Sequence, residues 1–137
     1  MNAKEYLEQY QRIEAKARIY QQEIERIRTQ AEGLSINLDG LPKGSGTRND
    51  KMERLAVQLA EYETKFQQEL SRMWSYSMGI INALEQLQDQ KHQTILYRRY
   101  IKGETWECIA YEMGISWRHC YRLHGRALQK LEEILNK

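Results

Sequence analysis

An uninterrupted spacing of apolar residues by three and four positions runs through the start of the chain. Its members are Ala3, Tyr6, Tyr10, Ile13, Ala17, Tyr20, Ile24, Ile27, Ala31 and Leu34. This spacing keeps one apolar seam on one helix face and favours left-handed supercoiling against a partner helix. A lone helix of this polarity is only marginally stable in water, so the seam needs a second helix to cover it. We therefore predict a coiled-coil helix over residues 1–34.

A second long helix is expected after residues 35–48, which read SINLDGLPKGSGTR and have the composition of a flexible loop. This helix should span residues 49–90 and begin at Asn49 or Asp50, since either side chain can cap it. The two helices can pack as a hairpin within the chain, against another subunit, or both. The expected apolar seam, with a stutter at Phe66 and a possible bend at Gly79, is Met52, Leu55, Leu59, Tyr62, Phe66, Leu70, Met73, Ser77, Ile80, Leu84 and Leu87.

Shorter helices are predicted from residue 91 onward, so we treat residues 91–137 as a separate domain. The first should end at Gly103, the second should be capped by Thr105, and the third should be capped by Ser116 after a left-handed turn at Gly114. The residues expected to face inward are Ile95, Leu96, Tyr100, Trp106, Ile109, Ala110, Met113, Cys120, Leu123, Ala127, Leu131 and Ile134. A small residue at Ala110 and a glycine at Gly114 match the spacing of a helix-turn-helix. The predicted fold class is thus all-α, with long antiparallel coiled-coil helices followed by a helix-turn-helix domain.

The outward face of the last helix is basic. Helical geometry places Arg118, Tyr121, Arg122, Gly125, Arg126 and Gln129 on it, and residues 116–130 contain four Lys and Arg but no Asp or Glu. Residues 91–137 hold 9 Lys and Arg against 5 Asp and Glu, whereas residues 1–90 hold 12 against 14. A basic face alone is often only a solvated surface. Because it follows the turn pattern, and because arginine can grip guanine edges or phosphates, we predict DNA binding.

The ILYRRY helix, the GETWECIAYEMGIS segment and the RLHGRALQKL segment resemble the promoter-binding fourth region of bacterial sigma factors. This resemblance covers residues 84–131 and implies that Trp117, Arg118, Tyr121 and Arg122 read promoter DNA. Trp117 and Tyr121 stand where that family usually has polar residues, so the base preference is expected to differ. The promoter-melting segment of a sigma factor is absent, and a coiled coil takes its place.

The whole chain, including the MNAKEYL start and the PKGSGT loop, resembles phage and prophage proteins related to the ArpU and RinA transcriptional regulators. That resemblance implies activation of late phage genes in the cytoplasm of a bacterial host. We expect a homo-oligomer formed through the coiled coil, with double-stranded DNA and host RNA polymerase as partners. The expected DNA-binding residues are Ser116, Trp117, Arg118, Tyr121, Arg122 and Arg126. The alternatives are a DNA-packaging protein of the small terminase type and a coiled-coil adaptor that contacts RNA polymerase.

Other functional signals are weak. Cys108, His119, Cys120 and His124 are close in sequence, but their spacing is not that of a zinc site, so we expect no metal or other cofactor. The sequence has no phosphate-binding loop, nucleophile elbow or catalytic carboxylate pair, and we expect His92 to be solvated, so enzymatic activity is not predicted. No apolar run reaches transmembrane length and the N-terminus is polar, which favours a cytosolic protein with reduced thiols.

Overall fold

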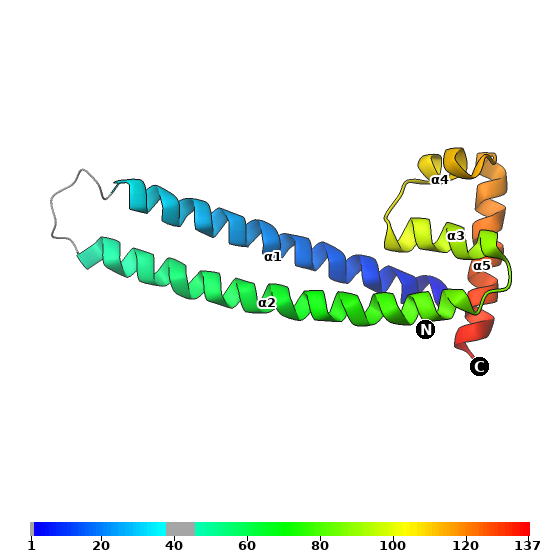
Figure 1. The fold of residues 1–137 in the computed structure, drawn as a ribbon, viewed down its shortest axis with the longest axis horizontal. Helices are drawn as coiled ribbons and strands as arrows, with labels where there is room; N and C mark the ends of the chain where they lie inside the picture. Colours follow the sequence, from blue (N-terminus) through cyan, green and yellow to red (C-terminus); the bar gives the residue numbers. More distant parts are fainter. Residues whose placement is uncertain (1, 38–45) are drawn as a thin grey trace. The chain divides into compact units, whose positions relative to one another are not determined.

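The structure, a computed structural model, describes residues 2–37 and 46–137, and all regular structure in these residues is helical (Figure 1). The predicted all-α class is therefore confirmed. None of the described helices is long and apolar enough to cross a membrane. The helices are α1 (Ala3–Asn37), α2 (Gly46–Glu85), α3 (Gln90–Leu96), the π-helix η2 (Tyr97–Ile101), α4 (Trp106–Met113) and α5 (Trp117–Leu135).

The ends of the two long helices differ from those expected. Helix α1 continues to Asn37 and α2 begins at Gly46, so both helices extend into the predicted loop over residues 35–48. The remainder of that loop, residues 38–45, lies outside the described residues. At its other end α2 stops at Glu85 instead of residue 90, and Asp89 caps α3 by accepting a 2.9 Å hydrogen bond from the Lys91 backbone N–H. Asp89 is a favourable cap that starts a new helix before the predicted boundary.

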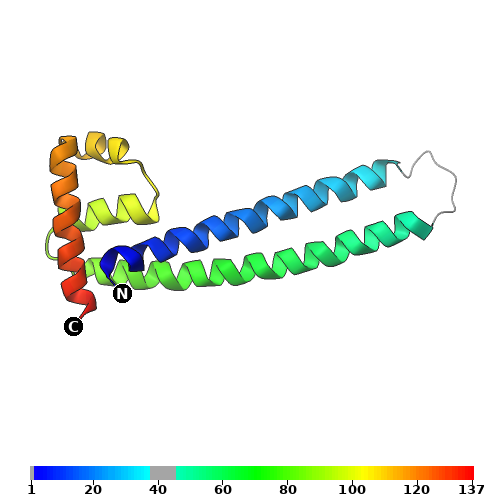
Figure 2. The ribbon, with the colours of Figure 1, turned by 180° about the vertical axis from the view of Figure 1, so that it is seen from behind.

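The chain forms two compact units, of which one is Glu14–Ser71. Within it, the segments of α1 and α2 lie side by side and run in opposite directions (Figures 1 and 2). The rings of Tyr20 and Tyr62 have centroids 6.0 Å apart, and Arg28 forms a 2.9 Å ion pair with Glu63. In this unit, which we call the hairpin unit, each helix thus covers the seam of the other within a single chain.

The buried face of α2 follows a different set of residues from the predicted one. It includes Met52, Leu55, Leu59, Tyr62, Phe66, Glu69, Met73, Tyr76, Ile80 and Ala83, which are all buried or partly buried and alternate by three and four without a break. The predicted Leu84 is buried beside them, and the predicted Leu87 is buried just after the end of α2. The placement of Leu70 on this face, and the stutter inferred from it, are wrong, because Leu70 is 37% exposed and Glu69 only 5%. The Lys16 ammonium lies 3.7 Å from the Glu69 carboxylate, which offsets part of the cost of burying that charge.

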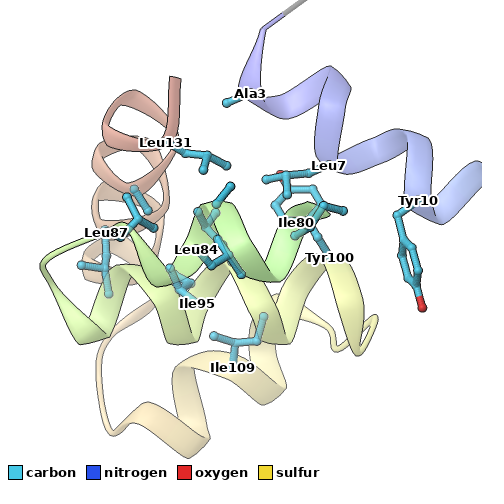
Figure 3. Packing of buried hydrophobic residues seen from close by; sticks show 14 of the residues in the cluster. Ala3, Leu7, Tyr10, Ile80, Leu84, Leu87, Ile95, Tyr100, Ile109 and Leu131 are labelled. Carbon is cyan, nitrogen blue, oxygen red and sulfur yellow. The ribbon is translucent and has the colours of Figure 1, made fainter. Parts of the chain in front are cut away.

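The second compact unit, which we call the core unit, contains the described residues up to Ile13 together with Arg72–Lys137. Its buried cluster joins the start of α1, the end of α2 and the short C-terminal helices (Figure 3). The C-terminal segment of this unit thus starts at Arg72, within α2, whereas the sequence suggested a domain over residues 91–137. The cluster consists of Ala3, Leu7, Tyr10, Ile80, Ala83, Leu84, Leu87, Ile95, Leu96, Tyr100, Ile109, Ala110, Cys120, Leu123, Ala127 and Leu131.

Most of the inward-facing residues predicted for the C-terminal helices are confirmed. Nine of the twelve are in the buried cluster, while Trp106, Met113 and Ile134 pack against it and are partly buried. The predicted helix caps are confirmed as well, since the Thr105 hydroxyl accepts from the Cys108 N–H and the Ser116 hydroxyl accepts from the His119 N–H, each at 3.1 Å. Gly114 has φ +64° and ψ +35°, in the left-handed region that was expected.

Two glycines of the core unit, one in the left-handed turn and one within α5, should respond in opposite ways to substitution by alanine. A side chain at Gly114 would be strained by its positive φ although the surrounding space is open, so Gly114→Ala should destabilise the core unit by about 1 kcal/mol. Gly125 lies within α5, and a methyl group added there would meet no neighbouring atom within 4 Å, so Gly125→Ala should stabilise the unit by about 0.5–1 kcal/mol. Chemical unfolding of both variants measures the difference, and equal effects would contradict the turn geometry.

Candidate nucleic-acid interface

The exposed surface of α5 collects the residues that were expected to bind DNA. Trp117, Arg118, Tyr121, Arg122 and Arg126 are all exposed, and Ser116 is the N-cap that starts the helix. The opposite face of the same helix is fixed in the core by the buried residues Cys120, Leu123, Ala127 and Leu131. Helix α4 meets α5 at its N-terminal end through a short, sharp turn, which leaves the first turns of α5 at the edge of the unit (Figures 1 and 2).

The exposed residues of α5 form distinct rows along the helix. With 3.6 residues per turn, Arg118 and Arg122 lie opposite the buried face, one turn apart. Trp117 and Tyr121 form a second row on one flank, and their ring centroids are 5.7 Å apart. Arg126 lies on the other flank, further from the N-terminus of the helix. The first two turns thus present paired arginines beside paired aromatic rings.

The positive charge on this face is not neutralised within the described part of the chain. Arg118, Arg122 and Arg126 form no ion pair there, and the only paired cation of α5 is Lys130, whose ammonium lies 3.7 Å from the Glu133 carboxylate. Acidic side chains begin on this helix only at Glu132. Such a surface attracts a polyanion, and its guanidinium groups are free to bind one.

The aromatic row continues into a small cluster that links α5 to α4 and η2. Trp106, the first residue of α4, stacks on Tyr121 with ring centroids 5.9 Å apart and meets the edge of His124 at 4.5 Å. The Arg99 guanidinium lies 4.6 Å from the centre of the Trp106 ring, in a cation–π contact. Trp106, expected only as a core residue, is therefore also the support behind Tyr121.

Helix η2 explains how Arg99 reaches this cluster. Its wide turn, closed by a 3.1 Å hydrogen bond from the Lys102 N–H to the Tyr97 carbonyl, directs Tyr100 into the core and leaves Arg99 over Trp106. Arg99 donates to the Glu104 carbonyl at 3.0 Å, and its own carbonyl accepts from the Gln11 side chain at 3.1 Å. Both ends of Arg99 are thus held in place. Sequence reasoning did not find this role, because no local pattern connects Arg99 with Trp106.

A partly buried hydrogen bond between Tyr100 and His124 joins η2 to α5. The Tyr100 oxygen and His124 Nε2 are 2.8 Å apart, and the two rings stack. Burial, together with Lys4 and Arg99, lowers the pKa of His124 to about 4. Burial and the nearby Glu8 raise the pKa of Tyr100 to about 12. Both groups are therefore neutral at pH 7, and the positive charge of α5 comes from its arginines and Lys130.

The remaining titratable residues singled out in the sequence do not form a second site. Cys120 is buried in the core, where burial raises the pKa of its thiol, whereas Cys108 is exposed on α4. No three His, Cys, Asp or Glu residues in the described ranges are arranged to hold a metal ion. The expectation that His92 is solvated is wrong, because His92 is buried, with Nε2 3.7 Å from the Asp89 carboxylate. His92 lies in the first turn of α3, which follows the Asp89 cap directly.

Comparisons with known proteins give a family without an assigned activity. A family model described as "Protein of unknown function (DUF722)" matches residues 2–133. No curated protein and no solved structure matches the chain. The function therefore has to be inferred from the surface described above.

Proposed function

We propose that this chain, which belongs to the DUF722 family, is a sequence-specific DNA-binding transcriptional regulator. In this proposal α4, the turn at Gly114 and α5 act as a helix-turn-helix that places the N-terminal turns of α5 in the major groove. The observation that carries the proposal is the exposed face of α5, where Arg118, Arg122 and Arg126 project without an ion-pair partner among the described residues. The protein acts by binding and not by catalysis.

The dimensions and composition of α5 fit a major groove. A groove about 12 Å wide admits one α-helix, and the side chains of its first turns reach the base edges. Arg118 lies in the first turn after the Ser116 cap, where it can form a bidentate contact with guanine. Arg126 lies two turns further along, where a helix leaves the groove and passes the phosphates. Arg122 lies between them and is placed for either contact.

The biological setting that we propose rests on the resemblances in the sequence. Similarity to the fourth region of sigma factors and to ArpU- and RinA-related regulators supports a role in activating late phage genes inside a bacterial host. Host RNA polymerase is then the partner expected beside the promoter. A small terminase-like packaging protein would also bind DNA, but its bound sites would map to packaging sequences and not to promoters.

Two substitutions on α5 separate base reading from backbone binding. Arg118→Ala should weaken binding to the preferred duplex by about 1–3 kcal/mol and relax the sequence preference. Arg126→Ala should weaken all duplexes about equally and reduce the slope of log affinity against log salt by about one unit. The measurement is a titration of each variant, at several salt concentrations, with the duplex that the wild type selects from a randomised library and with a scrambled version of it.

The titration also tests the adaptor alternative. If both substitutions leave the affinity for every duplex unchanged, this face does not bind DNA. A wild-type protein that binds RNA polymerase but shows no salt-sensitive DNA binding would support the adaptor instead. Gln58→Ala, on the exposed surface of α2 in the hairpin unit, serves as a control. It should leave the affinity for duplex DNA and the salt dependence of that affinity unchanged.

We further propose that the hairpin unit is a coiled coil through which two copies of the chain associate. The seam residues Ile24 and Ile27 are already covered by α2, so a second copy would pack on the outside of the pair. An open groove beside the pair is lined mainly by polar side chains, with Phe66 among its few apolar members, and Ile19 and Val57 are exposed elsewhere on the same unit. A symmetric dimer is the default assembly for a homo-oligomer of this kind. Sedimentation at micromolar concentration should give a dimer or larger species, and a monomer would contradict the proposal.

A further inference from the structure

Two large aromatic side chains are exposed at the part of α5 that the proposed function places in the major groove. The side chains of Trp117 and Tyr121 are 47% and 56% exposed, and they lie one helical turn apart beside Arg118 and Arg122. Exposed apolar groups that cluster on one surface usually mark a site of interaction. Here the cluster lies within a basic surface, so its partner must combine negative charge with an apolar group.

The two rings are supported from one side and open on the other. Tyr121 stacks on Trp106, and Trp106 is covered by the Arg99 guanidinium at 4.6 Å. Arg99 is held in turn by its hydrogen bonds with Glu104 and Gln11. Because neighbouring groups already restrict Tyr121, a ligand that covers it loses little side-chain entropy on binding. The surface is therefore prepared for an apolar contact before any ligand arrives.

We infer that the paired rings of Trp117 and Tyr121 select thymine by covering its 5-methyl group in the major groove. Among the four bases, only thymine presents a methyl group there, and apolar side chains are the groups that contact it. Arg118 and Arg122, in the neighbouring row, match the guanine acceptors in the same groove. The preferred duplex should therefore contain thymine next to guanine. This inference rests on the proposed function, since it needs α5 in the major groove.

Replacing thymine by uracil tests the inference, because it removes only the methyl group and keeps base pairing and charge. The probe is the duplex that the wild type enriches most from a randomised library, with each thymine replaced singly by deoxyuridine. At the one or two thymines under the rings we expect about fourfold weaker binding. This is the burial of one methyl-sized group, about 0.8 kcal/mol, converted at about 1.4 kcal/mol for each tenfold change.

Removing either ring should reduce the discrimination between thymine and uracil. Trp117→Ala and Tyr121→Ala should each bind the two duplexes more nearly equally, whereas Tyr121→Phe, which keeps the ring, should keep the difference. Tyr111→Ala is the matched control, since Tyr111 is an 84% exposed aromatic on α4, outside the cluster, and its loss should leave the discrimination unchanged. Circular dichroism confirms that each variant is folded.

The outcomes distinguish this inference from the proposed function. Wild-type protein that binds duplex DNA through Arg118, but binds thymine and uracil equally at every position, overturns the inference alone. A selected duplex that contains no thymine also overturns the inference. Equal affinity for the single strand of the same sequence overturns it as well, because rings that stack on unpaired bases need no methyl group. Failure of the wild type to bind any duplex overturns both.

Discussion

Leu7→Ala should destabilise the core unit by about 2–5 kcal/mol, although Leu7 is more than 80 positions from the candidate interface in the sequence. Leu7 is 0% exposed and belongs to the same buried cluster as Ile95 and Leu131 (Figure 3). Truncating it leaves a cavity where α1, α2 and the C-terminal helices meet. The same variant should also lose DNA affinity, because the unfolded unit no longer presents α5.

Tryptophan fluorescence measures this effect selectively. All three tryptophans of the chain, Trp74, Trp106 and Trp117, lie in the core unit, so denaturant unfolding followed by their emission reports on that unit. Arg12→Ala is the control on the same helix, since Arg12 is exposed within the same unit and its truncation should cost less than about 0.5 kcal/mol. If the two variants unfold at the same denaturant concentration, the start of α1 does not contribute to the core.

Acid should weaken the core unit through His124. The pKa of this imidazole is about 4 in the folded protein and 6.5 when unperturbed, so the unfolded chain binds more protons between these pH values. Stability should therefore fall as the pH is lowered from 6.5 to 4. The loss from this one group should reach about 2–3 kcal/mol, after allowance for its partial exposure to solvent.

A histidine variant isolates this contribution from the carboxylates that titrate in the same range. His124→Gln removes the ionisable ring, so its free energy of unfolding should change less between pH 6.5 and pH 4 than that of the wild type. His119→Gln is the matched control, because it replaces an exposed histidine of the same helix and leaves the Tyr100–His124 hydrogen bond in place. An identical pH dependence in all three proteins would show that His124 is protonated without cost, contrary to its burial beside Tyr100.

The local features of the fold could be predicted from the sequence. Thr105, Gly114 and Ser116 each act through backbone geometry within a few residues, so the sequence around them is sufficient to place the ends of α4 and α5. The buried face of α5 was equally accessible, because the period of an α-helix assigns Cys120, Leu123, Ala127 and Leu131 to one side. The exposed positions of Arg118, Tyr121, Arg122 and Arg126 follow from the same geometry.

Features that depend on contacts distant in sequence could not be predicted in this way. An apolar pattern favours Leu70 over Glu69, and the ion pair that helps a glutamate to occupy the buried face comes from Lys16, which is distant in the sequence. Leu7 was missed because the three-and-four spacing was satisfied by Tyr6. The extent of the core unit was missed for a related reason, since the apolar spacing of α2 continues unchanged past Arg72, where its packing partners change.

The support behind the candidate interface was the least predictable part. The wide turn of η2 has no clear sequence signature, yet it determines that Tyr100 points inward and that Arg99 covers Trp106. The aromatic row of Trp117, Tyr121 and Trp106 then depends on the way α4 meets α5. The sequence indicated which residues are on the surface, and the structure shows which of them are held rigid by their neighbours.

The most direct test of the central claim is to locate the DNA on the folded protein by NMR. A short DNA duplex of random sequence, titrated into isotope-labelled protein, should shift the amide resonances of residues 116–126 and the indole N–H resonance of Trp117. These shifts should be smaller at higher salt. The amides of residues 14–34 in the hairpin unit should not move. Shifts confined to the hairpin unit, or no shifts at low salt, would contradict DNA binding by the exposed face of α5.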